Sequence, residues 1–304
     1  MKDQAEKLRQ LAFKKLNSPN QNEKIPRINE TRVLSVTSGK GGVGKTNFTI
    51  NLALSLSDLG YRVVVIDADI GFANIDVILG MMPRYTLADV IRKDMKITEI
   101  IEEGPNNIKV IAGGSGIKDI TKLSDNKLHY LTNQLLTLDD YADFILIDTG
   151  AGLSNVVMNF VNASDELILV TTPEPTSLTD GYAMLKAINN FKTEKYSSKN
   201  KVNIVVNRAT NKKEADQVFD KLNKVTSRFL DLQLDNLGYI YDSKIVVDSV
   251  KKQTPFLINY PNSSVSKRIN IMALNLLSNN EYGSSNGLKK FIDNFKSFFN
   301  RKGN

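Results

Sequence analysis

The residues best suited to chemistry form a glycine-rich run that also contains two lysines and a threonine. Its glycines let backbone N–H groups approach a phosphate closely, and a helix opening at Lys45 adds the positive end of its dipole. The Lys45 ammonium can neutralise β- and γ-phosphates, and the Thr46 hydroxyl can ligate Mg²⁺. This P-loop pattern predicts a nucleotide site, and the alternative is a glycine-rich turn that binds nothing. The predicted site consists of Gly39, Lys40, Gly41, Gly42, Val43, Gly44, Lys45, Thr46 and Asn47.

Two acidic segments follow this run, each at the end of an apolar stretch. Asp67 and Asp69 close the first stretch, and Asp148 closes the second, two residues before Gly150. Carboxylates at the carboxyl end of a parallel strand face the ligand crevice of an α/β sheet. After a P-loop, the second segment resembles the Walker B and switch II arrangement, which implies that Asp148 holds Mg²⁺ through water and that a backbone amide near Gly150 senses a γ-phosphate. For Asp67 and Asp69 the alternative is an acidic turn without chemistry.

The elements that must position these residues alternate along the chain. Continuous apolar strands between helices predict an α/β fold, with a mostly parallel central sheet and helices on both faces. Expected strands lie at 33–37, 63–66, 108–111, 144–147, 167–171, 202–206 and 237–240. Expected helices lie near 44–59, 124–138, 154–162, 176–192, 211–229, 243–251 and 263–277. The predicted organisation is a helix and linker at 1–30, a P-loop domain at 31–280, and a tether and amphipathic helix at 281–304.

Composition excludes several classes of site. The 304 residues contain no Cys and one His, so disulfides, Cys-ligated metals, thiol nucleophiles and His-rich metal sites are excluded. Lys and Arg number 40 against 33 Asp and Glu. Residues 1–30 carry seven basic and four acidic side chains, residues 286–304 carry five and one, and 28 of each remain between them. A neutral body disfavours a broad DNA-binding face, and we expect no nucleic-acid partner.

Lys40 gives the chain a family resemblance. With a second lysine at the start of KGGVGKT, residues 32–277 resemble the MinD/ParA-type deviant Walker A ATPases. In that family the corresponding lysine reaches phosphates held by the partner in a nucleotide-sandwich dimer. The resemblance therefore implies a catalytic Lys40 acting in trans, Asp69 positioning the attacking water and Asp67 near Mg²⁺. It also implies ATP and Mg²⁺ as cofactors and an ATP-dependent homodimer.

The same resemblance supplies expectations for the nucleotide base. The family has an Asn after a later strand, and Asn207 followed by Arg208 matches it. The Asn207 amide can donate to and accept from the adenine edge. The T-K-x-D motif of related GTPases is absent, so ATP is favoured over GTP. The segment 172–175 resembles the family's N-P-E turn, with Thr172 in place of Asn.

The C-terminal segment has an apolar face at helical spacing. Basic side chains lie off this face, so the segment is typical of an in-plane helix on anionic lipid. We therefore expect a cytoplasmic protein, peripheral at the inner face of the cell membrane. The alternatives are a terminal helix packed on the protein's own core and a protein-binding helix. The expected membrane-contacting residues are Phe291, Ile292, Phe295, Phe298 and Phe299.

The N-terminal segment resembles the activator helix of the FlhG family, also called YlxH or FleN. The resemblance implies control of flagellar number and placement, stimulation of the GTPase FlhF, and contacts with flagellar C-ring components. A simple helical extension is the alternative. The residues that carry this resemblance are Asp3, Gln4, Ala5, Leu8 and Arg9.

Other functions remain open at this point. A MinD-type division-site regulator shares the ATPase site and the membrane helix, but lacks this N-terminal extension. A ParA-type DNA segregation ATPase needs a basic face on its dimer. A membrane scaffold with a degenerate nucleotide site is disfavoured by the intact Lys45, Thr46, Asp69 and Asp148.

Overall fold

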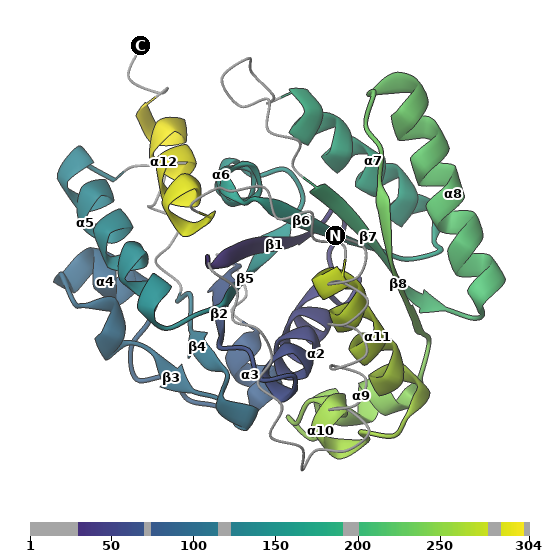
Figure 1. The fold of residues 1–304 in the computed structure, drawn as a ribbon, viewed down its shortest axis with the longest axis horizontal. Helices are drawn as coiled ribbons and strands as arrows, with labels where there is room; N and C mark the ends of the chain where they lie inside the picture. Colours follow the sequence, from purple (N-terminus) through teal and green to yellow (C-terminus); the bar gives the residue numbers. More distant parts are fainter. Residues whose placement is uncertain (1–29, 70–73, 115–122, 191–200, 279–286, 301–304) are drawn as a thin grey trace.

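One eight-stranded sheet forms the centre of the protein (Figure 1). The computed structural model describes residues 30–69, 74–114, 123–190, 201–278 and 287–300. The strand order is β3-β4-β2-β5-β1-β6-β7-β8, and every pairing is parallel except that of β3 with β4. The strands are β1 (Arg32–Ser38), β2 (Val63–Ala68), β3 (Glu102–Glu103), β4 (Lys109–Ile111), β5 (Phe144–Ala151), β6 (Glu166–Thr171), β7 (Lys201–Ala209) and β8 (Asp235–Tyr241).

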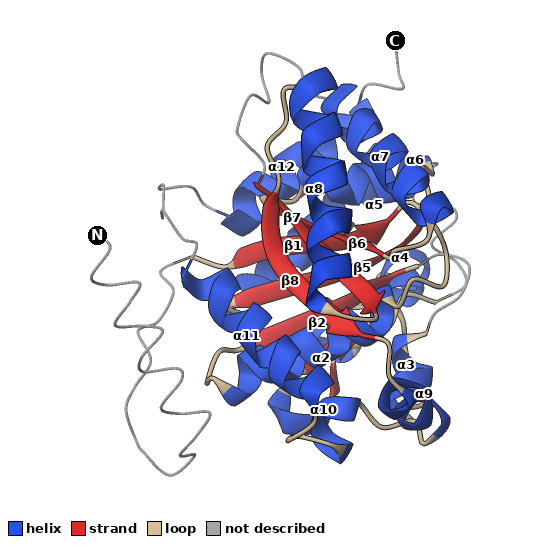
Figure 2. Ribbon diagram, turned by 90° about the vertical axis from the view of Figure 1, so that its right-hand side faces the viewer, coloured by secondary structure: helices blue, strands red, loops and turns tan. Residues whose placement is uncertain are grey.

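Helices cover both faces of this sheet, which buries the central strands on both sides. Figure 2, turned by a quarter, shows the strands enclosed between the helical layers. One face carries α2 (Lys45–Asp58), α3 (Ile75–Leu79), α9 (Lys244–Lys251), α10 (Phe256–Asn259) and α11 (Ser264–Ser278). The other carries α4 (Leu87–Lys93), α5 (Asp125–Leu136), α6 (Asn155–Ala163), α7 (Pro175–Asn190), α8 (Lys212–Phe229) and α12 (Gly287–Asn300). Among the described helices, none has both the length and the apolar character that crossing a bilayer requires.

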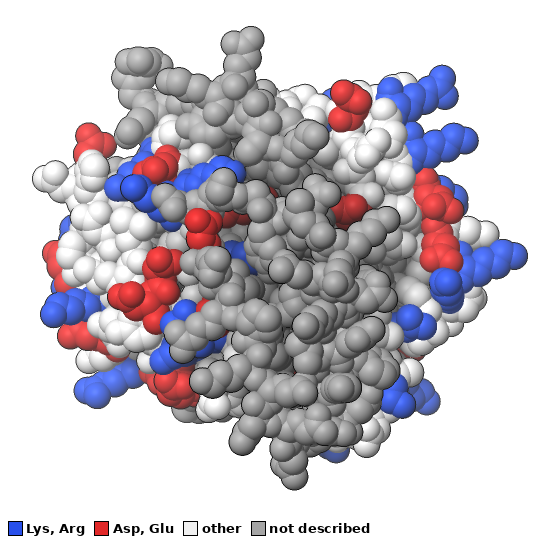
Figure 3. Space-filling model, in the orientation of Figure 1, with Lys and Arg blue, Asp and Glu red and all other residues white. Residues whose placement is uncertain are grey.

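The predicted fold class is confirmed, with the expected strands and helices in the expected order. Double-sided burial explains why the strands are continuously apolar rather than alternating. The short elements β3, α3, α4 and α10 were not predicted, because segments this short show no clear periodicity. Basic and acidic side chains are interspersed on the face shown in Figure 3, in keeping with the balanced charge of the central residues.

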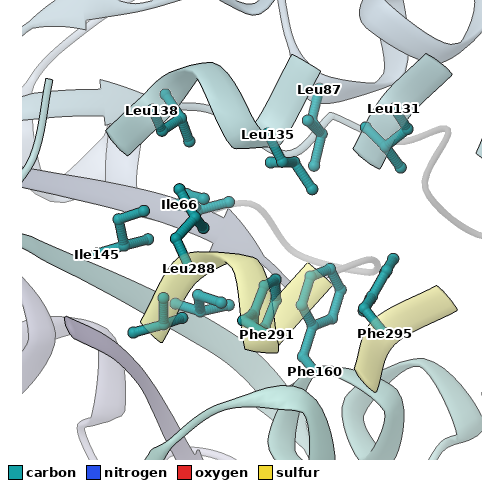
Figure 4. Close-up of a pocket in the computed structure, with 12 residues that line it drawn as sticks. Ile66, Leu87, Leu131, Leu135, Leu138, Ile145, Phe160, Leu288, Phe291 and Phe295 are labelled. Carbon is teal, nitrogen blue, oxygen red and sulfur yellow. The ribbon is translucent and has the colours of Figure 1, made fainter. Parts of the chain in front are cut away.

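The helix α12 packs into the protein's own core. It lies between α5 and α6, and Figure 4 shows its apolar side chains pointing into a groove lined by both helices. Phe291, Ile292 and Phe295 are no more than 3% exposed. The lipid-binding face expected at these residues is therefore covered here, as in the alternative of a helix packed on the core. The side chains of Phe298 and Phe299 lie outside the described part of the chain.

Polar contacts fix the first turns of α12. The Lys290 ammonium lies 3.3 Å from a carboxylate oxygen of Asp165, at the start of β6. The Asn294 amide donates to the carbonyl of Ala163 at 3.4 Å. Burial raises the pKa of Asp165 to about 6, against the lowering effect of Lys290. The docked helix thus supplies the counter-charge for a buried carboxylate.

The N-terminal segment rejoins the described structure beside the start of α12. A Cβ on Gly287 would overlap the carbonyl oxygen of Thr31, so glycine is required for this close approach. The Thr31 hydroxyl contacts Asp139 at 2.6 Å, and Arg32 pairs with Glu166 at 2.7 Å. Both tails therefore meet the body at one place, the N-terminal edge of β1.

The outermost parallel strand, β8, carries a bulge. Its pairing with β7 shifts by one residue, because Asn236 faces Ile204 whereas Gly238 faces Val205. Gly238 has φ 149°, which a side chain rarely allows, and the Asn275 amide donates to the carbonyl of Leu237 at 3.2 Å. The sheet therefore ends in an irregular edge.

Candidate nucleotide-binding and catalytic site

The P-loop connects β1 to α2 at the carboxyl edge of the sheet. Gly42 and Gly44 have φ of 75° and 94°, conformations that glycine adopts without strain. Their geometry turns the backbone so that α2 begins at Lys45, whose residue is only 7% exposed. Asn47 lies in the first turn of the same helix. The turn and the helix start thus form the phosphate cradle that the sequence predicts.

Thr46 and Asp148 meet at the start of α2. The Thr46 hydroxyl donates to one carboxylate oxygen of Asp148 at 2.7 Å, and Thr49 donates to the other at 3.1 Å. Burial raises the pKa of Asp148 to about 6, although these hydroxyls and the Lys45 charge lower it. Thr49 was not predicted. It lies three residues after Thr46, and this helical spacing is the signal that could have identified it.

Asp67 lies beside Asp148 because β2 and β5 pair in register at these two residues. Its carboxylate accepts backbone N–H groups from Asp69 at 2.9 Å and Asn74 at 3.1 Å. Burial and the charge of Asp148 raise the pKa of Asp67 to about 7.

This pair of carboxylates fits a divalent cation. Two neighbouring buried carboxylates destabilise each other's charged form, and a cation between them would reverse that effect. The hydroxyl of Thr46 completes an oxygen-rich set of the type that Mg²⁺ prefers. Thr46, Asp67 and Asp148 are thus the residues that would hold Mg²⁺ with a nucleotide.

Asp69 and Gly150 face each other across the mouth of this site. Asp69 is partly exposed at the end of β2, and its carboxylate lies 3.3 Å from where a Cβ on Gly150 would be. The N–H of Gly152 donates to the carbonyl of Ser38 at 3.0 Å, which joins this turn to the P-loop. The structure therefore brings Asp69, Asp148, Gly150 and the P-loop together at one edge of the sheet.

Lys40 is held by the segment that precedes and opens α7. Its ammonium lies 2.9 Å from a carboxylate oxygen of Glu174 and 3.0 Å from the Thr176 hydroxyl. The pKa of Glu174 is lowered by the hydrogen bond and charge of Lys40. Neither partner was predicted as a site residue, although Glu174 belongs to the turn at 172–175 that resembles a family motif. Both lysine and glutamate are substantially exposed, so the pair can separate in solvent.

Asn207 and Arg208 bind backbone carbonyls of the P-loop. The Asn207 amide donates to the carbonyl of Val43 at 2.7 Å, and its oxygen accepts the N–H of Arg208 at 2.9 Å. Arg208 donates to the carbonyl of Gly42 at 2.9 Å. The expected adenine-facing amide is therefore engaged with the loop backbone here, and the pair supports the shape of the P-loop.

Some expected site residues lie elsewhere. Asp3, Gln4, Ala5, Leu8 and Arg9 fall outside the described residues. The single histidine, His129, is exposed on α5 and contacts none of the nucleotide-site residues described above. Phe291, Ile292 and Phe295 lie in the α12 groove, on the face of the sheet opposite α2.

Comparisons with known proteins agree with this geometry. Residues 31–204 match the model of the family described as AAA domain. The antiactivator FleN of Pseudomonas aeruginosa is 38% identical over 79% of this chain and 84% of its own length. The flagellum site-determining protein YlxH of Helicobacter pylori is 34% identical over 99% of this chain and 98% of its own.

A solved structure shows the same fold with a nucleotide. The septum site-determining protein MinD of Pyrococcus horikoshii, complexed with Mg-ADP, superposes with a TM-score of 0.65 at 26% identity. The match covers 80% of this chain and 94% of that one.

Proposed function

The chain belongs to the FleN/YlxH family of MinD/ParA-type P-loop ATPases, and on that premise we propose that it is an ATP-hydrolysing dimerisation switch that regulates flagellar number and placement. The observation that carries the ATPase proposal is the Thr46 hydroxyl 2.7 Å from Asp148, next to the buried Lys45. The YlxH match spans the residues before β1 as well, which favours a flagellar over a division-site regulator.

Hydrolysis in this proposal uses residues already gathered at one edge. Lys45 and the P-loop N–H groups bind the phosphates. Thr46, Asp67 and Asp148 would hold Mg²⁺, which would supply charge screening for the phosphates. Asp69 orients water for in-line attack and accepts its proton. A backbone N–H near Gly150 contacts the γ-phosphate, so the end of β5 and the turn after it change position with the nucleotide.

Dimerisation requires Lys40 to change partners. Its ion pair with Glu174 at 2.9 Å keeps the ammonium on its own subunit. When two subunits meet through bound ATP, Lys40 leaves Glu174 for phosphates of the second subunit. A cation supplied in trans stabilises developing negative charge in the manner of an arginine finger.

Membrane binding in this proposal requires α12 to leave its groove. Burial of each large apolar side chain contributes about 1.5–3 kcal/mol, so α12 leaves only where lipid covers it again. Ile66 and Ile147 line the groove and directly precede Asp67 and Asp148. A shift of these strand ends on nucleotide binding thus displaces the groove residues against which α12 packs. Two anchors per dimer then act together by effective concentration.

Liposome sedimentation tests the switch. Wild type should bind vesicles of phosphatidylglycerol only with ATP. The Asp69→Ala protein should lose at least about a hundredfold in ADP formation yet remain on the vesicles, because bound ATP persists. The control is Asp248→Ala, an exposed aspartate on α9. Vesicle binding that is equal with and without ATP would contradict the proposal. So would an Asp69→Ala protein that dissociates from the vesicles as fast as wild type.

The N-terminal segment is proposed to stimulate the GTPase FlhF, and the ATPase body to contact flagellar C-ring components. The proposal for FlhF depends on the string from Asp3 to Arg9, with Gln4 orienting water in the partner's site. Purified FlhF should hydrolyse GTP faster with a peptide of residues 1–20. A Gln4→Ala peptide that stimulates equally contradicts the role of Gln4.

A further inference from the structure

The groove occupied by α12 needs a cover whenever α12 leaves it. Apart from α12, it is lined by apolar side chains of α4, α5, the short helical turn after α5, α6 and the strands beneath them (Figure 4). If α12 enters a bilayer, as the proposed function requires, this surface becomes one contiguous apolar patch, and such patches mark interaction sites. Among the residues that would be uncovered are Ile66, Leu131, Leu135, Leu138, Ile145 and Phe160.

The vacated groove also needs a cation. Asp165 lies at its edge with a side chain only 19% exposed, and Lys290 is the cation that faces it at 3.3 Å. Departure of α12 takes Lys290 away, and a buried carboxylate without a counter-charge destabilises the protein. A second occupant therefore requires an apolar helical face of similar length and a basic side chain near Asp165.

We propose that residues 3–16 of the same chain form this second occupant and enter the groove when α12 leaves. The segment has 14 residues, as many as α12, which corresponds to about 21 Å of helix. Most of its apolar residues fall on one side of a helix, and Lys14 and Lys15 lie near its end. The apolar residues are Ala5, Leu8, Leu11, Ala12, Phe13 and Leu16.

The connection to the body places this segment within reach. The described chain begins at Glu30, one residue before Thr31, whose carbonyl lies against Gly287 at the start of α12. Residues 17–29 span at most about 45 Å when extended, which is more than the length of the groove. The segment would enter from residue 16 and run antiparallel to the direction of α12. This orientation brings Lys14 and Lys15 to the end of the groove where Asp165 lies.

One groove then serves two helices in turn. With α12 docked, residues 3–16 are available to a partner protein; with α12 in the bilayer, they are covered. Membrane attachment and presentation of the N-terminal helix thus become mutually exclusive states of one chain. The inference depends on the proposed function only for the step that empties the groove.

Engineered disulfides test this exchange, since the chain has no cysteine of its own. Leu131 lies toward the Phe295 end of the groove, and Leu138 toward the Leu288 end (Figure 4). In the antiparallel orientation Leu8 reaches the Leu131 end, so the test pair is Leu8→Cys with Leu131→Cys. The matched control is Gln10→Cys with Leu131→Cys, because two residues along a helix turn the side chain to the opposite face.

The groove is emptied in two independent ways in the full chain. In the first arm, the cysteine pair is combined with Phe291→Asp and Phe295→Asp, which expel α12 without lipid. In the second arm, the protein carries the cysteine pair without these Asp substitutions, and ATP with phosphatidylglycerol vesicles draws α12 out. The intramolecular disulfide of the test pair should rise about tenfold in both arms, because the emptied groove admits a segment that its tether already keeps at high local concentration. The control pair should not change.

The outcomes separate the inference from the proposed function. A rise in the Asp variant alone supports the exchange and rejects the membrane step. No rise in either arm, an equal rise in the control pair, or disulfides between two chains overturns the exchange. If the Asp variant fails to fold, the vesicle arm decides.

Discussion

The two ends of the central strands carry different chemistry. At the carboxyl ends, Asp67, Asp69 and Asp148 face the P-loop and a start of helix that suits phosphate. At the amino ends, Thr31 bonds to η4 (Thr137–Asp140), Arg32 pairs with Glu166 of β6, and the Thr31 carbonyl packs closely against the first residue of α12. The first end is built to bind a ligand and the second to hold the tails.

The nucleotide site and the groove that holds the rest of α12 are nevertheless only one residue apart along β2 and β5. Ile66 and Ile147 point into the α12 groove, while the residues that follow them carry the catalytic-site carboxylates. Successive side chains of a strand point to opposite faces, so a displacement of one reaches the other through the backbone. Chemistry at one edge and packing under α12 are thus mechanically joined.

The largest expected effect is a loss of ATP hydrolysis that leaves the docking of α12 intact. Lys45→Ala should lower ATP hydrolysis by at least about a thousandfold, because no other side chain replaces the ammonium on the phosphates. The same substitution should leave α12 docked, which is measured as an unchanged rate of amide hydrogen exchange in residues 287–300. Hydrolysis within tenfold of wild type would contradict the role of Lys45. Hydrogen exchange of α12 as fast as in a Phe295→Ala protein would show that the regions are not separable.

The next effect concerns packing. Phe295 is fully buried in the groove, stacks on Phe291 with ring centroids 5.7 Å apart and packs on Phe160 at 5.0 Å. Phe295→Ala should lower the free energy of unfolding by about 3–5 kcal/mol, measured by urea denaturation. The control Lys289→Ala, on the exposed side of α12, should stay within about 0.5 kcal/mol. A loss no greater than in the control would show that α12 contributes little to the fold.

A smaller effect appears with pH in the nucleotide-free protein. The pKa of Asp67 is raised to about 7 and that of Asp148 to about 6, so the folded state binds protons more tightly than the unfolded chain. Stability is then fully present near pH 4 and declines as pH rises through about 6 to 7. The Tm should fall by several degrees from about pH 5 to about pH 8, and Mg-ATP should flatten this slope. A Tm that rises over this range would contradict the raised pKa values.

The smallest effect concerns Lys40. Glu174→Gln removes the exposed ion pair that keeps Lys40 on its own subunit, so ATP-dependent dimerisation should strengthen by about two- to fivefold. Analytical ultracentrifugation measures this change. The matched control is Glu214→Gln, a partly exposed glutamate on α8 that binds Thr210 instead. Weaker dimerisation of Glu174→Gln would show instead that Glu174 stabilises the dimer.

Prediction from sequence succeeded where the signal is local. The glycines, Lys45, Thr46, Asp67 and Asp148 stand at the ends of predicted elements, and parallel pairing alone brings such ends together. The partners of Lys40 escaped prediction because Glu174 lies 134 residues away in the chain, and only the packing of α7 brings it near.

The helix α12 shows a different limit. Its stripe of apolar residues predicts that one face is covered, but lipid and a protein groove satisfy the same pattern equally. Only the structure reveals the groove between α5 and α6 and the Lys290–Asp165 pair that marks its end. Asn207 is a similar case, since an amide can bind a base or a loop carbonyl with the same atoms.

The bulge in β8 bears on what happens when many copies crowd together. A regular outer strand would offer its free backbone groups to the sheet of a neighbouring molecule, and repeated pairing would produce fibres. The shift at Leu237 and the capping of its carbonyl by Asn275 break that template. Where many copies of the protein are concentrated together, this irregular edge therefore opposes sheet-to-sheet polymerisation.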